Sequence, residues 1–171
     1  MKKIFLFILL FTFSHTNSFS DNSHFIDFSK VLNTSKAGAA AQKTLKNKFE
    51  AETKKFKKQE TDIRKEESEI IAQKKIITKE IYQKKVETLR KKVSKLQSDK
   101  KKSFNAISKS RNDARQVILK AINPIMKKYM KEKNIRIVLD KKSVLLGDTS
   151  LEITNQIIDI LNEELPSLKV N

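Results

Sequence analysis

The sequence contains no cysteine and no tryptophan, and only two glycines and two prolines among its 171 residues. The absence of cysteine excludes disulfide-stapled proteins, zinc fingers and thiol enzymes. The scarcity of glycine and proline argues against a loop-rich protein and favours long helices. Histidine is also scarce, and because His15 lies in an N-terminal apolar segment, only His24 is left as a general base near neutral pH. The sequence therefore predicts a protein that is not an enzyme and needs no metal or cofactor.

Residues 1–20 have the layout of a secretory signal peptide. Lys2 and Lys3 precede an almost entirely apolar run from Ile4 to Phe13, and a small residue, Ser20, closes the polar stretch that follows. The run is about half as long as the roughly 20 residues that span a bilayer, which disfavours a permanent membrane anchor. We predict cleavage after Ser20. Because no cysteine is present to accept a lipid, we expect a soluble mature chain outside the cytoplasm.

Charge is distributed unevenly along the chain, which carries a formal net charge of +17. Residues 43–133 contain 29 basic and 12 acidic side chains, whereas residues 21–42 contain two of each and residues 134–171 contain four basic and six acidic ones. The middle segment thus carries the whole cationic excess. This division predicts one nearly neutral region that packs and one cationic region that is exposed.

Residues 43–122 predict two long helices, because this stretch has neither glycine nor proline and is rich in good helix formers. Apolar residues recur every seven positions at Phe49, Phe56, Ile63, Ile70 and Ile77. A second apolar stripe contains Val86, Leu89, Val93, Leu96, Ile107, Ala114, Ile118, Ala121 and Ile125. The two stripes predict an antiparallel hairpin with its tip near residues 76–80, with Thr78 as the N-cap and Glu80 in the first turn of the second helix. One continuous helix is the alternative.

The seam between these two helices is predicted to be thin. Its second core position is occupied by the polar residues Glu52, Gln59, Glu66 and Gln73. Such a seam does not stabilise a long coiled coil on its own. Pro124 removes one helical hydrogen bond near the end of the second helix, and we expect a bend there, where the exposed arm joins a packed base, rather than a helix end.

Residues 21–42 and 123–171 predict a small base that contains β-structure. Apolar and β-branched residues suggest a strand over 24–28, and 135–139 and 144–146 suggest two strands joined as a hairpin. Asn33, Thr34 and Ser35 are helix-cap candidates, and an amphipathic helix over 153–165 closes the chain. The predicted fold class is α+β, mostly α. Because so small a sheet cannot cover its own edges and core, we expect oligomerisation, and the small residues 37–41 predict close contact between helices or between subunits.

This order of segments resembles the Skp/OmpH family of periplasmic chaperones over essentially the whole mature chain. The similarity is carried by the small-residue segment Ser35–Gln42, the lysine-rich hairpin, the run Ile135–Asp140, and Glu152–Thr154 before the last helix, although the family usually has Asp at the position of Glu152. The resemblance implies a jellyfish-like homotrimer in the periplasm. It also implies a β-barrel-like body built from three chains and three helical arms around a cavity for unfolded outer-membrane proteins.

On this basis the arm is predicted to hold clients by many weak contacts, without ATP, because the chain has no glycine-rich phosphate loop. The predicted client surface consists of Phe49, Phe56, Phe104, Lys54, Lys55, Lys57, Lys58, Lys84, Lys85, Lys91, Lys92, Lys100, Lys101 and Lys102. The alternative for these residues is that the phenylalanines belong to the hairpin seam and the lysines only solvate the arm. The predicted oligomerisation residues are Phe25, Ile26, Phe28, Gly38, Ala41, Ile135, Ile137, Leu139, Val144 and Leu146.

Two other functions fit the same sequence. The first is an envelope polyanion binder, with lipopolysaccharide, acidic lipid or nucleic acid as its partner. Specific nucleic-acid binding is disfavoured, because no aromatic residues are interleaved with the basic runs. The second is a structural coiled-coil spacer, which is disfavoured by the polar seam positions.

Overall fold

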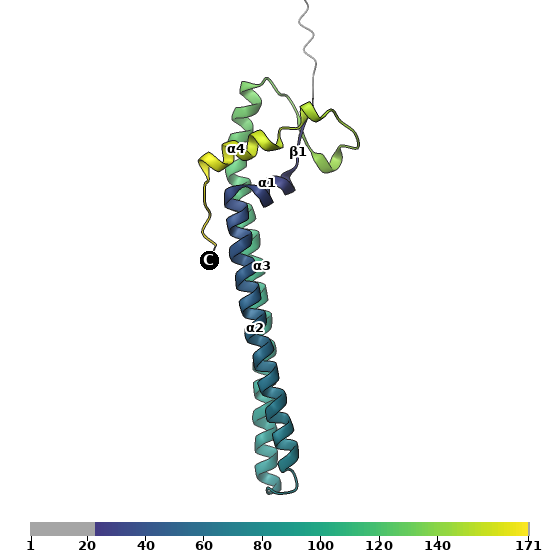
Figure 1. The fold of residues 1–171 in the computed structure, drawn as a ribbon, viewed down its shortest axis with the longest axis vertical. Helices are drawn as coiled ribbons and strands as arrows, with labels where there is room; N and C mark the ends of the chain where they lie inside the picture. Colours follow the sequence, from purple (N-terminus) through teal and green to yellow (C-terminus); the bar gives the residue numbers. More distant parts are fainter. Residues whose placement is uncertain (1–22, 171) are drawn as a thin grey trace, which may run out of the picture.

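Two long helices run side by side over most of the length of the molecule (Figure 1). The computed structural model describes residues 23–170, so the predicted signal peptide and its cleavage site lie outside the described part of the chain. Helix α2 spans Lys36–Gln73 and helix α3 spans Lys79–Glu132. The chain reverses between them, at one end of the molecule, while all other elements gather around the opposite end (Figure 1). We call residues 43–122 the arm, and residues 23–42 and 123–170 the base.

The reversal is held by the predicted cap. Thr78 is the N-cap of α3, and its hydroxyl accepts a hydrogen bond from the Ile81 amide at 3.4 Å, while Glu80 lies in the first turn. The Thr78 hydroxyl satisfies one of the free amides of the first turn, and the negative charge of Glu80 is favourable at the positive end of the helix dipole. The prediction for Thr78 and Glu80 is confirmed, and the alternative of one continuous helix is wrong.

The sheet in the described residues has two parallel strands. Strand β1 (His24–Ile26) pairs with β2 (Val138–Asp140), with His24 opposite Val138, and Phe25 also forms a parallel bridge to Glu152. The mostly helical α+β class is confirmed. Strand β1 therefore lies between two segments that are more than 100 residues away in the sequence.

The predicted hairpin of strands over 135–139 and 144–146 is wrong. After β2 the chain forms two short 3₁₀ helices, η1 (Lys141–Ser143) and η2 (Thr149–Leu151), and residues 144–146 are not a strand. Asp140 accepts a hydrogen bond from the Lys142 amide at 3.0 Å and Asp148 accepts one from the Ser150 amide at 2.8 Å. These local side-chain contacts to the backbone compete with strand pairing and favour tight turns.

A short helix, α1 (Phe28–Thr34), follows β1, so the predicted strand over 24–28 ends two residues earlier, at Ile26. Asp27 starts this helix by accepting a hydrogen bond from the Lys30 amide at 2.8 Å. The predicted cap Ser35 begins α2, and the closing helix is observed as α4 (Thr154–Glu164). Helix α3 continues through Pro124 to Glu132, so the prediction that Pro124 does not end the helix is confirmed.

The apolar core lies where the base meets the root of the arm: α4 packs on α3 and on α1, and α1 packs on α2. Its most buried members are Ile26, Val31, Ile122, Ile157 and Leu161. Nearly all of its members are branched aliphatic residues, which pack densely in a small volume. This core fixes the root of the arm and leaves the remainder of α2 and α3 to contact only each other.

Candidate functional site

The arm is held together by a mixture of apolar and polar contacts between α2 and α3. Four apolar side chains are buried along its part beyond the root: Phe56, Ile70, Leu96 and Ile107. Between them, the polar heptad positions of α2 contact α3: Glu66 pairs with Lys92 at 2.6 Å, the Ser103 hydroxyl donates to Glu52 at 2.9 Å, and Lys85 donates to Gln73 at 2.6 Å. Polar pairs between α2 and α3 therefore occupy the seam positions at which the sequence has no apolar residue.

Acidic residues on the arm are held in their charged form by neighbouring lysines. Lys100 pairs with Glu60 across the two helices at 2.6 Å, and this hydrogen bond and charge lower the pKa of Glu60 below its ordinary value of 4.5. Lys91 lowers the pKa of Glu87 in the same way, and Lys95 lowers that of Asp99. Glu60, Glu87 and Asp99 therefore each hold a lysine of the arm itself.

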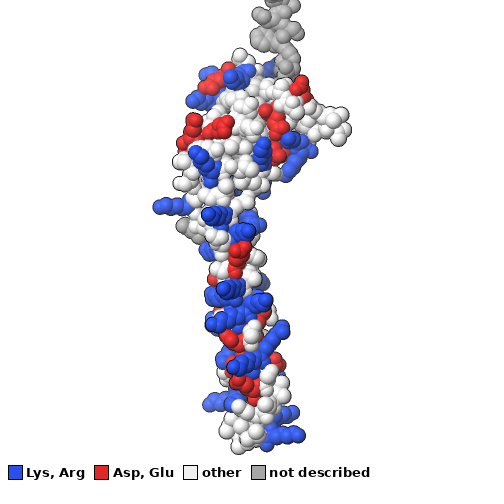
Figure 2. Space-filling model, in the orientation of Figure 1, with Lys and Arg blue, Asp and Glu red and all other residues white. Residues whose placement is uncertain are grey.

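The predicted client-surface lysines fall into two groups. Lys85, Lys92 and Lys100 contact α2 across the seam, and Lys55 and Lys91 pair with an acid of their own helix at 3.5 and 2.7 Å. The other six are exposed and form no ion pair among residues 23–170: Lys54, Lys57, Lys58, Lys84, Lys101 and Lys102. Figure 2 shows basic side chains gathered along the arm on the face in view. The arm therefore presents unpaired positive charges to the solvent.

The three predicted client-surface phenylalanines form one cluster with unequal exposure. Phe104 lies 5.4 Å from Phe49 and 6.0 Å from Phe56 between ring centroids. Phe56 is only 2% exposed, so its assignment to the client surface is corrected: it belongs to the seam, where its ring packs on Phe104 of α3. Phe104 is partly buried, whereas Phe49 is 48% exposed and remains a surface residue.

Exposed isoleucines at the tip were missed in the sequence. Ile71, Ile76 and Ile81 are exposed, with Ile76 at 82%, and Lys74, Lys75 and Lys79 lie beside them in the chain. The sequence does carry a signal for these residues, namely the adjacent isoleucine pairs at 70–71 and 76–77. One residue of each pair faces the seam, so the other points away from it. The tip therefore combines apolar and cationic side chains.

The predicted oligomerisation residues separate into buried and exposed sets. Five are buried within their own chain: Phe25, Ile26, Gly38, Ala41 and Ile135. Ile137, Leu139 and Leu146 are exposed, and Leu146 is 91% exposed next to Leu145 at 95%. Phe28 and Val144 are half-buried. The exposed members lie just before, on and after β2, whose outer edge pairs with no other strand in the described residues.

Gly38 is required by a contact inside the chain. A Cβ atom at this position would lie 2.0 Å from the carbonyl oxygen of Leu32, so α2 approaches α1 more closely than any larger residue permits. This bears out the predicted contact between helices at the small-residue segment. In the described residues the packing partner of Gly38 is α1 of the same chain, and its oligomerisation role stays a prediction.

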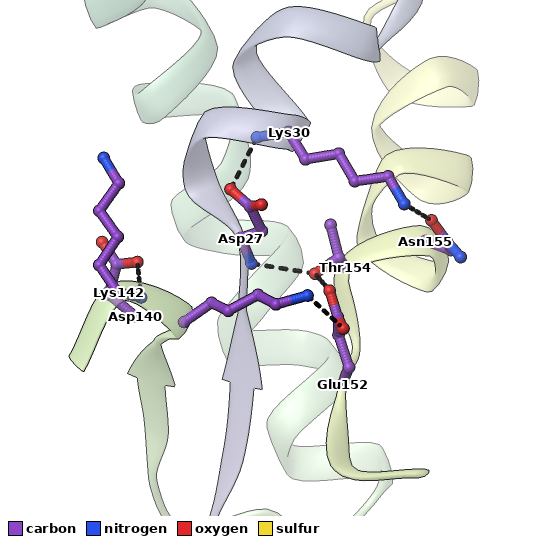
Figure 3. Close-up of polar contacts among 8 residues, drawn as sticks. Asp27, Lys30, Asp140, Lys142, Glu152, Thr154 and Asn155 are labelled. Atoms are coloured by element: carbon purple, nitrogen blue, oxygen red, sulfur yellow. Dashed lines mark hydrogen bonds and ion pairs between the residues drawn. The ribbon is translucent and has the colours of Figure 1, made fainter. Parts of the chain in front are cut away.

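A polar cluster fastens β1 to the start of α4 (Figure 3). The Asp27 amide donates to the Thr154 hydroxyl at 2.9 Å, and that hydroxyl donates to Glu152 at 2.8 Å. Lys141 pairs with the other oxygen of Glu152 at 2.8 Å, and this contact raises the pKa of Lys141. The same contact and the Thr154 hydroxyl lower the pKa of Glu152. Glu152 therefore secures the base without capping α4, whose N-cap residue is Ile153 and which has no side-chain cap hydrogen bond.

Neither a membrane-spanning helix nor a metal site was found within residues 23–170. No helix there is both long and apolar enough to cross a bilayer. The same residues hold no cluster of three or more acidic or histidine side chains arranged to bind a metal ion.

Comparisons with known proteins agree on one family. The profile of the family described as "Outer membrane protein (OmpH-like)" matches residues 23–161. A crystal structure from Caulobacter crescentus CB15, described as a candidate outer membrane chaperone (OmpH-like), superposes with a TM-score of 0.79 at 16% identity. The match covers 86% of this chain and 87% of that one, which shows a shared fold. No curated protein matches the sequence.

Proposed function

The chain belongs to the OmpH-like family, and from this premise we propose that it is an ATP-independent holdase chaperone of the periplasm. In this function it captures unfolded outer-membrane β-barrel proteins before they insert into the membrane and prevents their aggregation. The observation that carries the proposal is the arm, a long cationic helical pair with exposed apolar side chains and one end fixed in a compact base. At about 1.5 Å per residue, the 38 residues of α2 reach about 57 Å.

The surface chemistry of the arm suits a client without a fixed sequence. Strands of outer-membrane barrels alternate apolar and polar residues, and their open edges aggregate in water. Unpaired lysines such as Lys101 and Lys102 attract acidic unfolded chains over roughly 8 Å at physiological salt. Phe49 and the exposed tip isoleucines then contact apolar side chains of the client. Release follows when the client folds, since each contact is weak on its own.

We propose that the active form is a homotrimer whose base joins strands from three chains. The unpaired outer edge of β2 and the exposed Ile137, Leu139, Leu145 and Leu146 support this part of the proposal. Exposed apolar residues beside an open strand edge are a liability in a monomer. Three arms extending from one such base would enclose a cavity. Sedimentation equilibrium tests the trimer directly.

Light scattering from a urea-denatured porin, diluted into buffer that contains the purified protein and no ATP, tests the holdase. We expect complete suppression near three chains per client at low salt and weaker suppression at high salt, because salt screens the lysines. Replacing Lys54, Lys101 and Lys102 by Gln should weaken suppression and flatten its salt dependence. The matched control replaces Lys127, Lys128 and Lys131, three exposed lysines of the base, and should behave as the unmodified protein.

Two outcomes would count against this proposal. Suppression that is equally strong at all salt concentrations would contradict the electrostatic attraction of clients by the lysines. No suppression at any ratio, combined with tight binding to polyanions such as lipopolysaccharide, would instead support the polyanion-binding function.

A further inference from the structure

The arm ends in a segment that exposes apolar side chains, which we call the tip segment and define as residues 71–85. It includes the turn between α2 and α3, at the end of the arm that lies away from the base (Figure 1). Three isoleucines of the segment are exposed: Ile71 at 59%, Ile76 at 82% and Ile81 at 48%. They are half of the six large apolar side chains that the arm exposes. Exposed apolar surface is thus concentrated where the arm ends.

Positive charge is concentrated in the same segment. The tip segment contains one acid, Glu80, and five lysines: Lys74, Lys75, Lys79, Lys84 and Lys85. The segments that adjoin it, residues 60–70 and 86–99, together contain six basic and seven acidic side chains and are almost neutral. Lys85 donates a hydrogen bond to α2, whereas the other four lysines are exposed and form no ion pair among residues 23–170. Figure 2 shows basic side chains beside an uncharged end of the arm.

The backbone of the turn forms its hydrogen bonds internally. The Lys74 amide donates to the Ile71 carbonyl at 3.2 Å. The amides of Ile76 and Ile77 both donate to the Gln73 carbonyl, at 2.9 and 3.1 Å. Backbone groups without partners are costly to remove from water. Because these amides already have partners, the turn can enter a less hydrated environment at a lower cost than an open loop.

We propose that the tip segment docks on the surface of a bilayer that contains acidic phospholipids. The exposed isoleucines enter the boundary between head groups and acyl chains, and the flexible lysines beside them contact the phosphate groups. Lys74 lies 5.9 Å from the ring centroid of Tyr82, an aromatic side chain of the kind enriched at membrane interfaces. The contact is peripheral, because no helix within residues 23–170 is long and apolar enough to cross a bilayer.

The shape and chemistry of the tip segment disfavour other partners. A specific protein partner usually covers about 800 Å² on each side, whereas the end of a helical pair is convex (Figure 1). Lipids are fluid and rearrange around a convex end. A nucleic acid binds through cations and stacked aromatic rings and gains nothing from exposed isoleucines. An acidic bilayer offers negative charge and apolar chains at one surface, which matches both features of the segment.

Co-sedimentation with phospholipid vesicles tests the proposal. The chain of residues 21–171 is used, because the apolar run 4–13 would itself bind lipid. The acidic vesicles contain about one third phosphatidylglycerol in phosphatidylcholine, and vesicles of phosphatidylcholine alone are the neutral control. We expect roughly tenfold stronger partitioning onto the acidic vesicles, and a decrease with rising salt.

One pair of variants tests the apolar part of the contact. Ile71→Ser with Ile76→Ser should weaken partitioning about tenfold, because interfacial binding scales with the apolar area that enters the lipid. The matched control is Val93→Ser with Val117→Ser, two exposed apolar residues elsewhere on α3. It should change partitioning less than about twofold.

A second pair of variants tests the cationic part. Replacing Lys74, Lys75 and Lys79 by Gln should weaken partitioning about tenfold and flatten its salt dependence. The control makes the same charge change at three exposed lysines elsewhere on the arm, Lys48, Lys109 and Lys120, and should weaken partitioning only about twofold. All of these positions are exposed, so the variants should retain the helical circular dichroism of the unmodified protein.

A fluorescent reporter measures insertion itself. The chain has no tryptophan, so Ile76→Trp introduces a single one at the tip. We expect its emission to shift to shorter wavelength when acidic vesicles are added, because the indole ring leaves water. Phe49→Trp, at an exposed position of the arm outside the tip segment, is the control and should show no shift.

Several results would overturn the proposal. These are equal partitioning onto neutral and acidic vesicles, equal effects of the tip and control variants, or an unshifted emission of Ile76→Trp. Binding to lipopolysaccharide but not to phospholipid vesicles would also overturn it and would assign the lysines to a polyanion.

The docking is tested separately from the holdase function. The tip isoleucines also contact clients in the proposed function, so vesicle binding is measured without a client and suppression of porin aggregation without vesicles. Suppression without vesicle binding would refute the docking alone, and vesicle binding without suppression would refute the holdase alone.

Discussion

The base and the arm of this protein are stabilised in different ways. In the base, Ile125, Ile157 and Leu161 are almost completely removed from water and belong to one apolar cluster with residues of α1. In the arm, buried apolar residues alternate with polar pairs such as Lys100–Glu60, and most side chains stay exposed. We infer that packing in the base contributes most of the stability of the molecule, whereas the arm needs only enough contacts between α2 and α3 to stay folded as a helical pair. A surface for many weak contacts is compatible with such an arm.

Truncating an apolar side chain should reveal the largest difference between the two regions, measured as the loss of stability in the base and in the arm. Leu161→Ala should destabilise the protein by about 2–5 kcal/mol, because it leaves a cavity in the base. Ile63→Ala, at a half-buried seam position of the arm, should cost about 1 kcal/mol, because the site is partly hydrated already. Urea unfolding at one fixed protein concentration measures both. Equal losses would show that the arm depends on packing as much as the base does.

Adding one methyl group at the junction of the two regions should have the next largest effect. Gly38→Ala places a Cβ against the Leu32 carbonyl, and we expect a net destabilisation of about 1–3 kcal/mol even though alanine is the better helix former. Ala40→Gln, an exposed position one turn into the same helix, is the control and should change stability by a few tenths of a kcal/mol. A native melting temperature for Gly38→Ala would contradict the close approach of α1 and α2.

The two helix caps allow a direct comparison of the regions. Ser35 is buried in the base and accepts from the Gly38 amide at 3.2 Å, whereas Thr78 is exposed at the tip. We expect Ser35→Ala to cost about 1–2 kcal/mol and Thr78→Ala about 0.5 kcal/mol. Hydrogen exchange should show loss of protection at the start of α2 in the first variant and at the tip alone in the second. The reverse order would mean that the tip controls the hairpin.

The smallest effect is expected from the ion pairs. Folding lowers the pKa of Glu60 and Glu152 below 4.5, so their stabilising contribution is present above that pH and is lost as the pH falls through the lowered values. Glu60→Gln should remove part of the acid sensitivity of the arm, and Glu152→Gln part of that of the base. Urea midpoints between pH 3 and pH 7, with salt as a second variable, measure this. An unchanged pH profile in both variants would exclude these pairs as its source.

Several features of the fold could be predicted from the sequence because they depend on local patterns. The absence of glycine and proline between residues 43 and 122, together with the seven-residue spacing from Phe49 to Ile77, indicated the long helices. Thr78 and Glu80 indicated where the second helix begins. The strands of the base were less predictable, because β1 pairs with β2 across more than 100 residues and Asp140 and Asp148 divert the following segment into turns.

Placement of individual surface residues depended on the tertiary structure. Phe49 and Phe56 occupy equivalent heptad positions, yet one is half exposed and the other buried, because only the facing surface of α3 decides which is covered. Ile76 is exposed and the adjacent Ile77 is half-buried for the same reason.

The sequence by itself determined the helical arm, the excess of lysine on it and the cap at its tip, since helix propensity, charge and capping act within a few neighbouring residues. Which lysines pair across the seam, and the contact of Gly38 with α1, could be read only from the tertiary structure. These features depend on how separate segments approach one another, and no local pattern specifies that approach.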